Sequence, residues 1–322
     1  MNLPDRVAFT IPGLNIPIYW YAVLITLGIV LAVVAATYFA KKRKMPVDTA
    51  VDLCLWAVPI GFICARIYYV LFSLSEYHSF VEMINIRNGG LAIPGGIIGG
   101  LLGVCIYSLI KKKRILGYLD IMVPGVALAQ AIGRWGNFFN QEAYGTAVTK
   151  FLYFPFVVRI EDCGCDLAAQ GIRHGHLATF FYESMFCIII FITLLLLSRK
   201  QKRTGDLMLT YICMYTGERM ILEHFRTDAL MMNVFGLNVR VTQVLCAVLF
   251  LATVVYFIVR AVYENRHGKL LLPIIEDEYC DPHEEPHQPV QEQEQEQDID
   301  PSKAMIVEAE EDDTLPGADE DQ

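Results

Sequence analysis

Long apolar stretches alternate with short polar connections along most of the chain. Four of them, at 18–40, 51–74, 180–198 and 241–259, are each about as long as the roughly 20 residues that cross a bilayer core. Three further stretches, at 91–110, 118–132 and 207–225, are interrupted by glycine, proline or charged residues. Membrane helices tolerate such interruptions where they face protein or a cavity. The pattern predicts an all-α, polytopic membrane protein with about seven transmembrane helices.

Basic residues gather in the connections that follow the first, third, fifth and seventh apolar stretches. They form clusters at 41–44, 111–114 and 199–203, and the pair Arg260 and Arg266. Cytoplasmic connections of membrane proteins carry an excess of lysine and arginine. We therefore expect the N-terminus outside and the C-terminus in the cytoplasm. The first apolar stretch precedes its basic cluster and is longer than the apolar part of a signal peptide, so we expect it to remain as an anchor.

The composition narrows the class further. Apolar residues make up 54% of the chain and charged residues 19%, which excludes an ordinary soluble enzyme of this length. Residues 274–322 hold 19 of the 35 acidic side chains and only Lys303 of the 26 basic ones. Positive charge elsewhere lies in short clusters between apolar runs, which excludes nucleic acid as a partner. We expect a transmembrane domain over residues 1–270 and an acidic, disordered cytoplasmic tail over residues 271–322.

Polar residues within or beside the apolar stretches are the first candidates for function, because an ionisable group at membrane depth costs about 2.5–3.5 kcal/mol. They concentrate near the predicted outer ends of the helices. The set comprises Arg66, Arg134, Asn137, Asn140, Glu142, Glu183, Glu218, Arg219, Glu223 and Arg226.

The sixth apolar stretch carries Tyr215, Arg219, Glu223 and Arg226 at spacings of four, four and three residues. On a helix these side chains share one face. Planar guanidinium groups are preferred partners of phosphate, so this face suits an anionic lipid headgroup. The alternative is a structural ladder of arginine and glutamate that holds the helix to its neighbours.

The segment 133–145 places Arg134, Asn137, Asn140 and Glu142 among three glycines. Glycines let the backbone turn sharply and approach a ligand closely. An ordinary re-entrant turn needs the glycines but not this polar set, so the segment indicates a binding site.

A third segment, 88–100, contains glycines at four-residue spacing, including Gly95 and Gly99. Such spacing is typical of close helix packing. The entry to this segment, Gly89 and Gly90, could still line a headgroup site.

With these residues in view, the chain resembles the bacterial prolipoprotein diacylglyceryl transferases over about residues 15–265. Segment 133–145 is similar to that family's signature, and segment 215–228 to its sixth helix. The pair Trp20 and Tyr21, the glycines of 89–96 and the segment 178–184 are similar to three further motifs of the family.

The resemblance implies transfer of the diacylglyceryl group of phosphatidylglycerol to the lipobox cysteine thiol of prolipoproteins, the first step of lipoprotein maturation. The implied partners are phosphatidylglycerol, prolipoprotein signal peptides with a lipobox cysteine, and the lipid bilayer. The implied location is the bacterial cytoplasmic membrane, as a multi-pass protein. No cofactor is expected, and no metal, because Cys163 and Cys165 lack further ligands apart from His174 and His176.

The resemblance also assigns roles to the polar residues. The catalytic group would be Arg134, Arg219, Glu142, Glu223 and Tyr215, with the two arginines clamping the phosphate. Phosphatidylglycerol would be bound by Arg134, Asn137, Asn140, Tyr21, Gly89 and Gly90.

Two positions depart from the family pattern. Many members have a histidine in the glycine-rich turn where this chain has Pro94, and a histidine where it has Leu177. The alternatives for the base are His174, His176, a carboxylate, or stabilisation of the thiolate by the local positive field. A catalytically inactive lipid-binding relative and a small-solute or lipid transporter are the alternative functions. The chain has no internal repeat of the kind many transporters show, which disfavours transport.

Overall fold

The computed structural model describes residues 5–13, 15–46, 48–77, 79–85, 89–150, 152–160, 174–227, 231–234, 237–275 and 279. Of the predicted tail, 271–322, residues 276–278 and 280–322 lie outside the described residues, as do Cys163 and Cys165.

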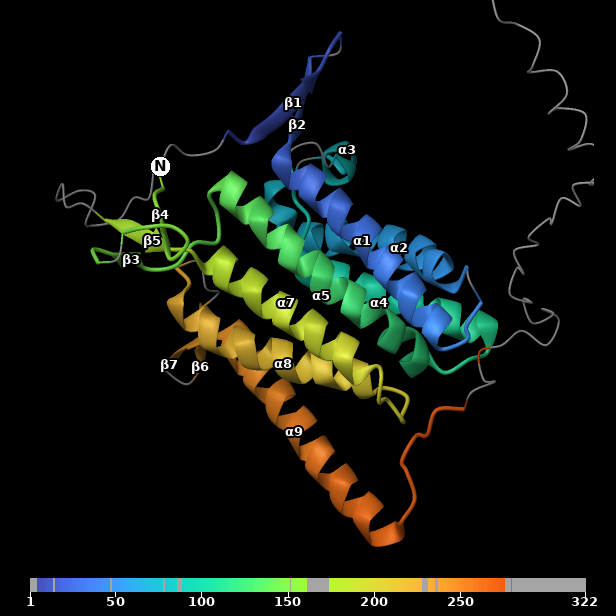
Figure 1. The fold of residues 1–322 in the computed structure, drawn as a ribbon. Helices are drawn as coiled ribbons and strands as arrows, with labels where there is room; N and C mark the ends of the chain where they lie inside the picture. Colours follow the sequence, from blue (N-terminus) through green and yellow to red (C-terminus); the bar gives the residue numbers. More distant parts are fainter. Residues whose placement is uncertain are drawn as a thin grey trace, which may run out of the picture. The chain divides into compact units, whose positions relative to one another are not determined.

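Each of the seven predicted stretches coincides with a long helix (Figure 1). Within the described ranges, six helices are long and apolar enough to cross a membrane, namely α1 (Trp20–Lys42), α2 (Thr49–Phe72), α4 (Ile93–Lys111), α5 (Ile115–Asn140), α7 (Thr179–Leu197) and α9 (Val241–His267). Helix α8 (Asp206–Leu222), with 17 residues, is shorter. The prediction of a polytopic, mainly helical membrane protein is confirmed.

The all-α prediction is incomplete, because the part of the chain that the structure describes also contains three small antiparallel sheets. Two are hairpins, β1 (Val7–Ile11) with β2 (Ile16–Tyr19) and β6 (Met231–Val234) with β7 (Leu237–Arg240). The third has the order β3-β5-β4, made of Ala147–Val148, Gly175–Leu177 and Val157–Val158. Short helices complete the fold: α3 (Phe80–Ile84), η1 (Leu74–Glu76) and η2 (Glu223–Phe225). These elements are too short to produce a clear periodic pattern in the sequence.

Glycines bring α2 and α4 into close contact. A Cβ atom on Gly95 would lie 2.5 Å from the Cys64 carbonyl oxygen, and one on Gly99 would lie 2.6 Å from the Ile60 carbonyl oxygen. The backbones approach where these two positions lack side chains. The predicted packing role of the glycine spacing is confirmed.

Helix α5 is longer than the sequence suggested, since it continues from Ile132 to Asn140. The glycines at 133 and 136 lie inside the helix and do not form a turn. The chain turns instead at Gln141 and Ala143, whose φ angles are both 54°. Gly136 has a packing role, because a Cβ atom there would lie 2.6 Å from the Tyr21 ring.

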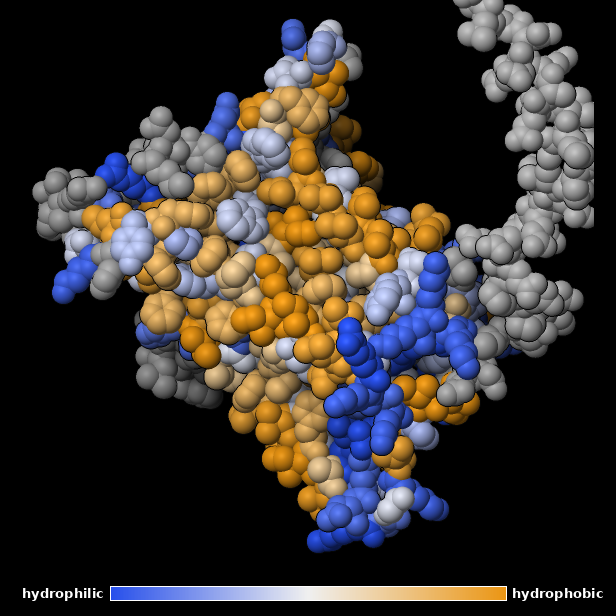
Figure 2. Space-filling view, in the orientation of Figure 1, coloured by the Kyte–Doolittle hydropathy of each residue, from blue (hydrophilic) through white to orange (hydrophobic). Residues whose placement is uncertain are grey.

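The outer surface of the helices is largely apolar. Figure 2 shows a broad apolar area over the middle of the molecule and hydrophilic residues gathered at the lower end, where α9 finishes. Buried side chains such as Leu53, Ile121 and Leu194 form the core between α2, α5 and α7. An apolar exterior around a small core is typical of a protein surrounded by lipid.

The segment after α9 returns to the helices. The Thr204 amide donates to the Leu272 carbonyl at 2.9 Å, and the Tyr279 hydroxyl donates to the Arg114 carbonyl at 2.8 Å. The compact unit that contains the helices extends to Cys280. Leu272 and Tyr279 thus contact the helical part of the chain, and the predicted domain boundary after residue 270 stays a prediction.

Candidate functional site

Glu183, in the first turns of α7, is the centre of a buried charged cluster. Its side chain is 3% exposed, and its Oε2 lies 2.7 Å from Nη1 of Arg134 at the end of α5. Its Oε1 pairs with Nη1 of Arg219 from α8 and lies 3.6 Å from Nη1 of Arg226. One carboxylate from α7 thus holds three guanidinium groups from two other parts of the chain.

The end of α8 adds a second carboxylate to this cluster. Oε2 of Glu223 lies 3.0 Å from Nη2 of Arg219 and forms an ion pair with it. The Glu223 carbonyl accepts a hydrogen bond from Arg240, at the start of α9. Tyr215 lies one turn before Arg219 and stacks on Tyr211 with ring centroids 5.7 Å apart. The predicted common face of α8 is therefore present, and the predicted ladder of arginine and glutamate forms part of it.

Asn137, Asn140 and Glu142 form a second group at the end of α5. The side-chain amides of Asn137 and Asn140 donate to Oε1 of Glu142 at 3.1 and 3.2 Å. Both amides orient the carboxylate from the same helix end. Tyr21 interacts electrostatically with Glu142 and with Arg134, so it links this group to the buried cluster.

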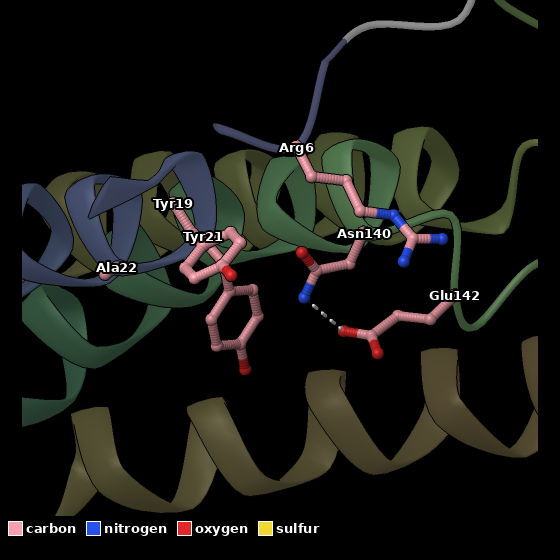
Figure 3. Close-up of a pocket in the computed structure, with 6 residues that line it drawn as sticks. All are labelled: Arg6, Tyr19, Tyr21, Ala22, Asn140 and Glu142. Atoms are coloured by element: carbon pink, nitrogen blue, oxygen red, sulfur yellow. Dashed lines mark hydrogen bonds between the residues drawn. The ribbon is translucent and has the colours of Figure 1, made fainter. Parts of the chain in front are cut away.

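A pocket of about 380 Å³ opens beside this second group. It is lined by Arg6, Tyr19, Tyr21, Ala22, Asn140 and Glu142, as Figure 3 shows. The predicted binding residues Tyr21 and Asn140 and the predicted catalytic residue Glu142 thus meet at one cavity. Hydroxyl, amide, carboxylate and guanidinium groups there provide both hydrogen-bond donors and acceptors.

Short contacts bind the loop after α5 to the starts and ends of its neighbours. The Gly145 amide donates to the Leu177 carbonyl at 2.9 Å, and the Thr179 hydroxyl donates to the Ala143 carbonyl at 2.6 Å. Gly145 also forms an isolated bridge with Arg226. A Cβ atom on Gly145 would lie 2.9 Å from the Cβ atom of Leu177, so the lack of a side chain at Gly145 lets this loop approach β5.

His176 lies in the central strand of the three-stranded sheet and is 2% exposed. Its Nδ1 lies 3.0 Å from the Gly145 carbonyl, and because a carbonyl only accepts, this nitrogen carries the proton. Burial lowers the pKa of His176, the Gly145 carbonyl raises it by less, and His174 lowers it further. His176 is therefore neutral and tied to the loop that follows α5.

Gly89 and Gly90 are not part of the pocket lining and contact Arg66 instead. Their carbonyls accept hydrogen bonds from Nη1 of Arg66 at 3.0 and 2.8 Å, and a Cβ atom on Gly90 would lie 2.2 Å from that nitrogen. Arg66 also donates to Met83, Glu82 and Asn85, so its guanidinium is fully used by backbone carbonyls. The contacts give these glycines a structural role, and their binding of lipid stays a prediction. Pro94 lies in the first turn of α4.

Sequence reasoning missed the central position of Glu183 and the presence of Arg6. Glu183 was visible as a carboxylate opening an apolar stretch, but its three partners come from distant segments. Arg6 lies outside the apolar stretches and gave no signal. Within the described part of the chain, no three histidine, cysteine, aspartate or glutamate side chains gather as a metal site would require.

The fold and the site together define a polytopic membrane protein with a buried arginine–glutamate cluster beside a polar pocket. Comparison with known proteins identifies the family. The family model described as prolipoprotein diacylglyceryl transferase matches residues 6–259 of this chain. This chain belongs to that family.

Three relatives illustrate the similarity. The phosphatidylglycerol–prolipoprotein diacylglyceryl transferase 1 of Clostridium perfringens is 42% identical over 74% of this chain and 88% of its own length. Relatives named phosphatidylglycerol–prolipoprotein diacylglyceryl transferase are 39% identical in Bacillus cytotoxicus, over 80% of this chain and 92% of theirs, and in Listeria welshimeri, over 81% and 91%.

Proposed function

We propose that this protein transfers the diacylglyceryl group of phosphatidylglycerol to the thiol of the lipobox cysteine in a prolipoprotein, the first step of lipoprotein maturation. The observation that carries the proposal is the meeting of Arg134 and Arg219 on Glu183 in a chain of this family. Buried guanidinium groups fixed in this way suit the phosphate of an anionic lipid.

The two arginines keep donors for a substrate. Each guanidinium has five N–H groups, and Glu183 takes Nη1 of both Arg134 and Arg219. Glu223 also pairs with Nη2 of Arg219, and in this proposal the N–H groups that remain on the two arginines hold phosphate oxygens. In this proposal Glu183 and Glu223 position the arginines, because both carboxylates are buried against them.

The reaction is a displacement at the glyceryl carbon that bears the phosphate. The cysteine sulfur forms the new C–S bond, the C–O bond breaks, and glycerol phosphate leaves with the electron pair. Negative charge therefore grows on the phosphate oxygens in the transition state, where Arg134 and Arg219 stabilise it. In this proposal Tyr215, one turn from Arg219, donates to the same oxygens.

The thiol must lose its proton, because only the thiolate attacks. In this proposal the positive field of Arg134 and Arg219 favours the thiolate, and the proton passes to the surrounding water. Glu142, which lines the pocket, belongs to the headgroup site. Asn137 and Asn140 orient that carboxylate and, with Tyr21, hold the headgroup. His176 is buried and its Nδ1 donates a hydrogen bond to the Gly145 carbonyl, so in this proposal it positions the loop after α5.

We place the protein in the bacterial cytoplasmic membrane with α8 as a seventh span and the N-terminus outside. Lys41 and Lys42 lie in the last turn of α1, at the end opposite to Tyr21. Arg266 lies in the last turn of α9, away from the site that contains Arg134. Basic residues favour the cytoplasmic face. The candidate site then opens outward, where exported precursors emerge.

The test is an assay with purified protein, phosphatidylglycerol and a lipobox peptide, followed by mass spectrometry of the peptide. The proposal predicts a mass increase of one diacylglyceryl group on the cysteine, and loss of this product in Arg134→Ala and Arg219→Ala. Absence of product under conditions in which a relative is active would overturn the proposal and favour a lipid-binding relative without activity.

A further inference from the structure

Arg6 is the cation of the pocket that the proposed mechanism leaves unused. It precedes β1, and its carbonyl accepts a hydrogen bond from the Trp20 amide at 3.1 Å. The hairpin register, which pairs Val7 with Tyr19, keeps this part of the chain beside the start of α1. Arg6 is therefore fixed at the pocket by the backbone on both sides of the hairpin.

Figure 3 shows the Arg6 side chain extending across the pocket, with its guanidinium on the same side as Asn140 and Glu142. Among the described residues Arg6 forms no ion pair. Arg134 and Arg219, by contrast, are held by Glu183 and belong to the buried cluster. The pocket thus contains one guanidinium that is available to a bound molecule.

Arg6 and Glu142 have opposite hydrogen-bonding capacities. A guanidinium only donates and a carboxylate only accepts, so a group that does both satisfies the pair. An alcohol hydroxyl is such a group. An ammonium only donates, and it would meet the positive charge of Arg6, which is unfavourable at short range. An ammonium could donate to Glu142 but would leave Arg6 without an acceptor, so the pair suits a neutral polyol and it is Arg6 that disfavours an amine.

We infer that Arg6 is a specificity-determining residue that reads the terminal glycerol of the lipid headgroup and disfavours headgroups that end in an ammonium. The inference rests on the proposed function, in which the phosphate lies at Arg134 and Arg219. The headgroup glycerol then extends into the pocket. There Arg6 donates to a hydroxyl oxygen and Glu142 accepts from that hydroxyl.

The experiment measures lipid kcat and KM separately for full-length protein in detergent micelles. The lipids are phosphatidylglycerol and phosphatidylethanolamine with the same acyl chains, and the acceptor is one lipobox peptide. For Arg6→Ala we expect a roughly 3- to 10-fold higher KM for phosphatidylglycerol, as for loss of one partly exposed charged hydrogen bond, with kcat little changed. The preference for phosphatidylglycerol over phosphatidylethanolamine should fall.

Two further substitutions separate charge from shape. Arg6→Lys keeps the positive charge, so it should retain most of the discrimination against phosphatidylethanolamine. Arg6→Glu reverses the charge and should reduce discrimination below that of Arg6→Ala. Arg266→Ala, which removes an exposed arginine near the end of α9, is the matched control and should leave both lipid KM values unchanged.

Unchanged KM and unchanged lipid preference in Arg6→Ala would overturn the inference, as would equal effects of Arg6→Lys and Arg6→Glu. A fall in kcat alone would also contradict it, because that result indicates a structural role. If the unaltered protein makes no product from phosphatidylglycerol, the proposed function itself fails, so the two failures are distinguishable.

Discussion

Arg134 places its Nη1 atom 2.7 Å from Oε2 of Glu183, which joins the last turns of α5 to the first turns of α7. The other oxygen of the same carboxylate pairs with Arg219 from α8. Three helices are therefore fixed by one buried carboxylate. In the proposed function this arrangement sets the spacing of the two guanidiniums before any lipid binds, which reduces the reorganisation needed in the transition state.

Glu183→Gln should reduce both activity and stability. The substitution leaves three guanidiniums without their shared anion, and removing one partner of a buried pair costs about 3–5 kcal/mol. We expect a lower midpoint of thermal unfolding in detergent and a kcat for the lipid transfer reduced by roughly 100-fold. Asp48→Asn, which removes an exposed carboxylate before α2, is the control and should behave like the unaltered protein. An active, fully stable Glu183→Gln protein would show that the carboxylate does not organise the site.

The contact between α2 and α4 gives a second prediction, on stability alone. Gly99→Ala would place a Cβ atom 2.6 Å from the Ile60 carbonyl oxygen, whereas Gly100→Ala meets nothing within 4 Å. We expect Gly99→Ala to lower the free energy of unfolding by about 1–3 kcal/mol, the usual cost of overpacking. Gly100→Ala should have little effect. Thermal unfolding of the two variants checks this, and equal midpoints would contradict the packing account.

The burial of His176 leads us to expect that the free energy of unfolding depends on pH. Burial lowers the pKa of this side chain below its ordinary value of 6.5, so the unfolded chain binds the proton more readily than the folded one. The stabilisation is present above pH 6.5 and is lost as the pH falls below that value, toward the lower pKa of the folded state. Unfolding midpoints of the unaltered protein and of His176→Asn should diverge at neutral pH and converge in acid. A parallel pH dependence in both proteins would assign the effect to other groups.

The helices could be predicted well from the sequence, because a helix that crosses a bilayer needs about 20 mostly apolar residues in a row, and such a stretch is easily recognised. It also predicted which side of α8 carries Arg219 and Glu223, since helix spacing alone determines that face. The end of α5 was predicted less well, because glycine weakens a helix only modestly and Gly136 packs against Tyr21. The pairing of Glu183 with partners from α5 and α8 depends on tertiary packing.

Arg6 could not be predicted from the sequence as a residue of this site. Its position depends on the β1–β2 hairpin, whose four- and five-residue strands are too short for a periodic signal. Gly89 and Gly90 were singled out by their place in a motif; their carbonyls accept hydrogen bonds from Arg66, and their binding of lipid stays a prediction. A residue's role at such a site follows from its neighbours in space.

The central claim is that Arg134 and Arg219 act together on one phosphate. A double-mutant cycle tests it most directly, using kcat/KM for phosphatidylglycerol in the unaltered protein, Arg134→Ala, Arg219→Ala and the double variant. Each single substitution should reduce kcat/KM by roughly 100- to 1,000-fold. Because both groups share Glu183 and the substrate phosphate, the double variant should lose far less than the product of the single losses. Losses that multiply would show two independent sites and contradict the account.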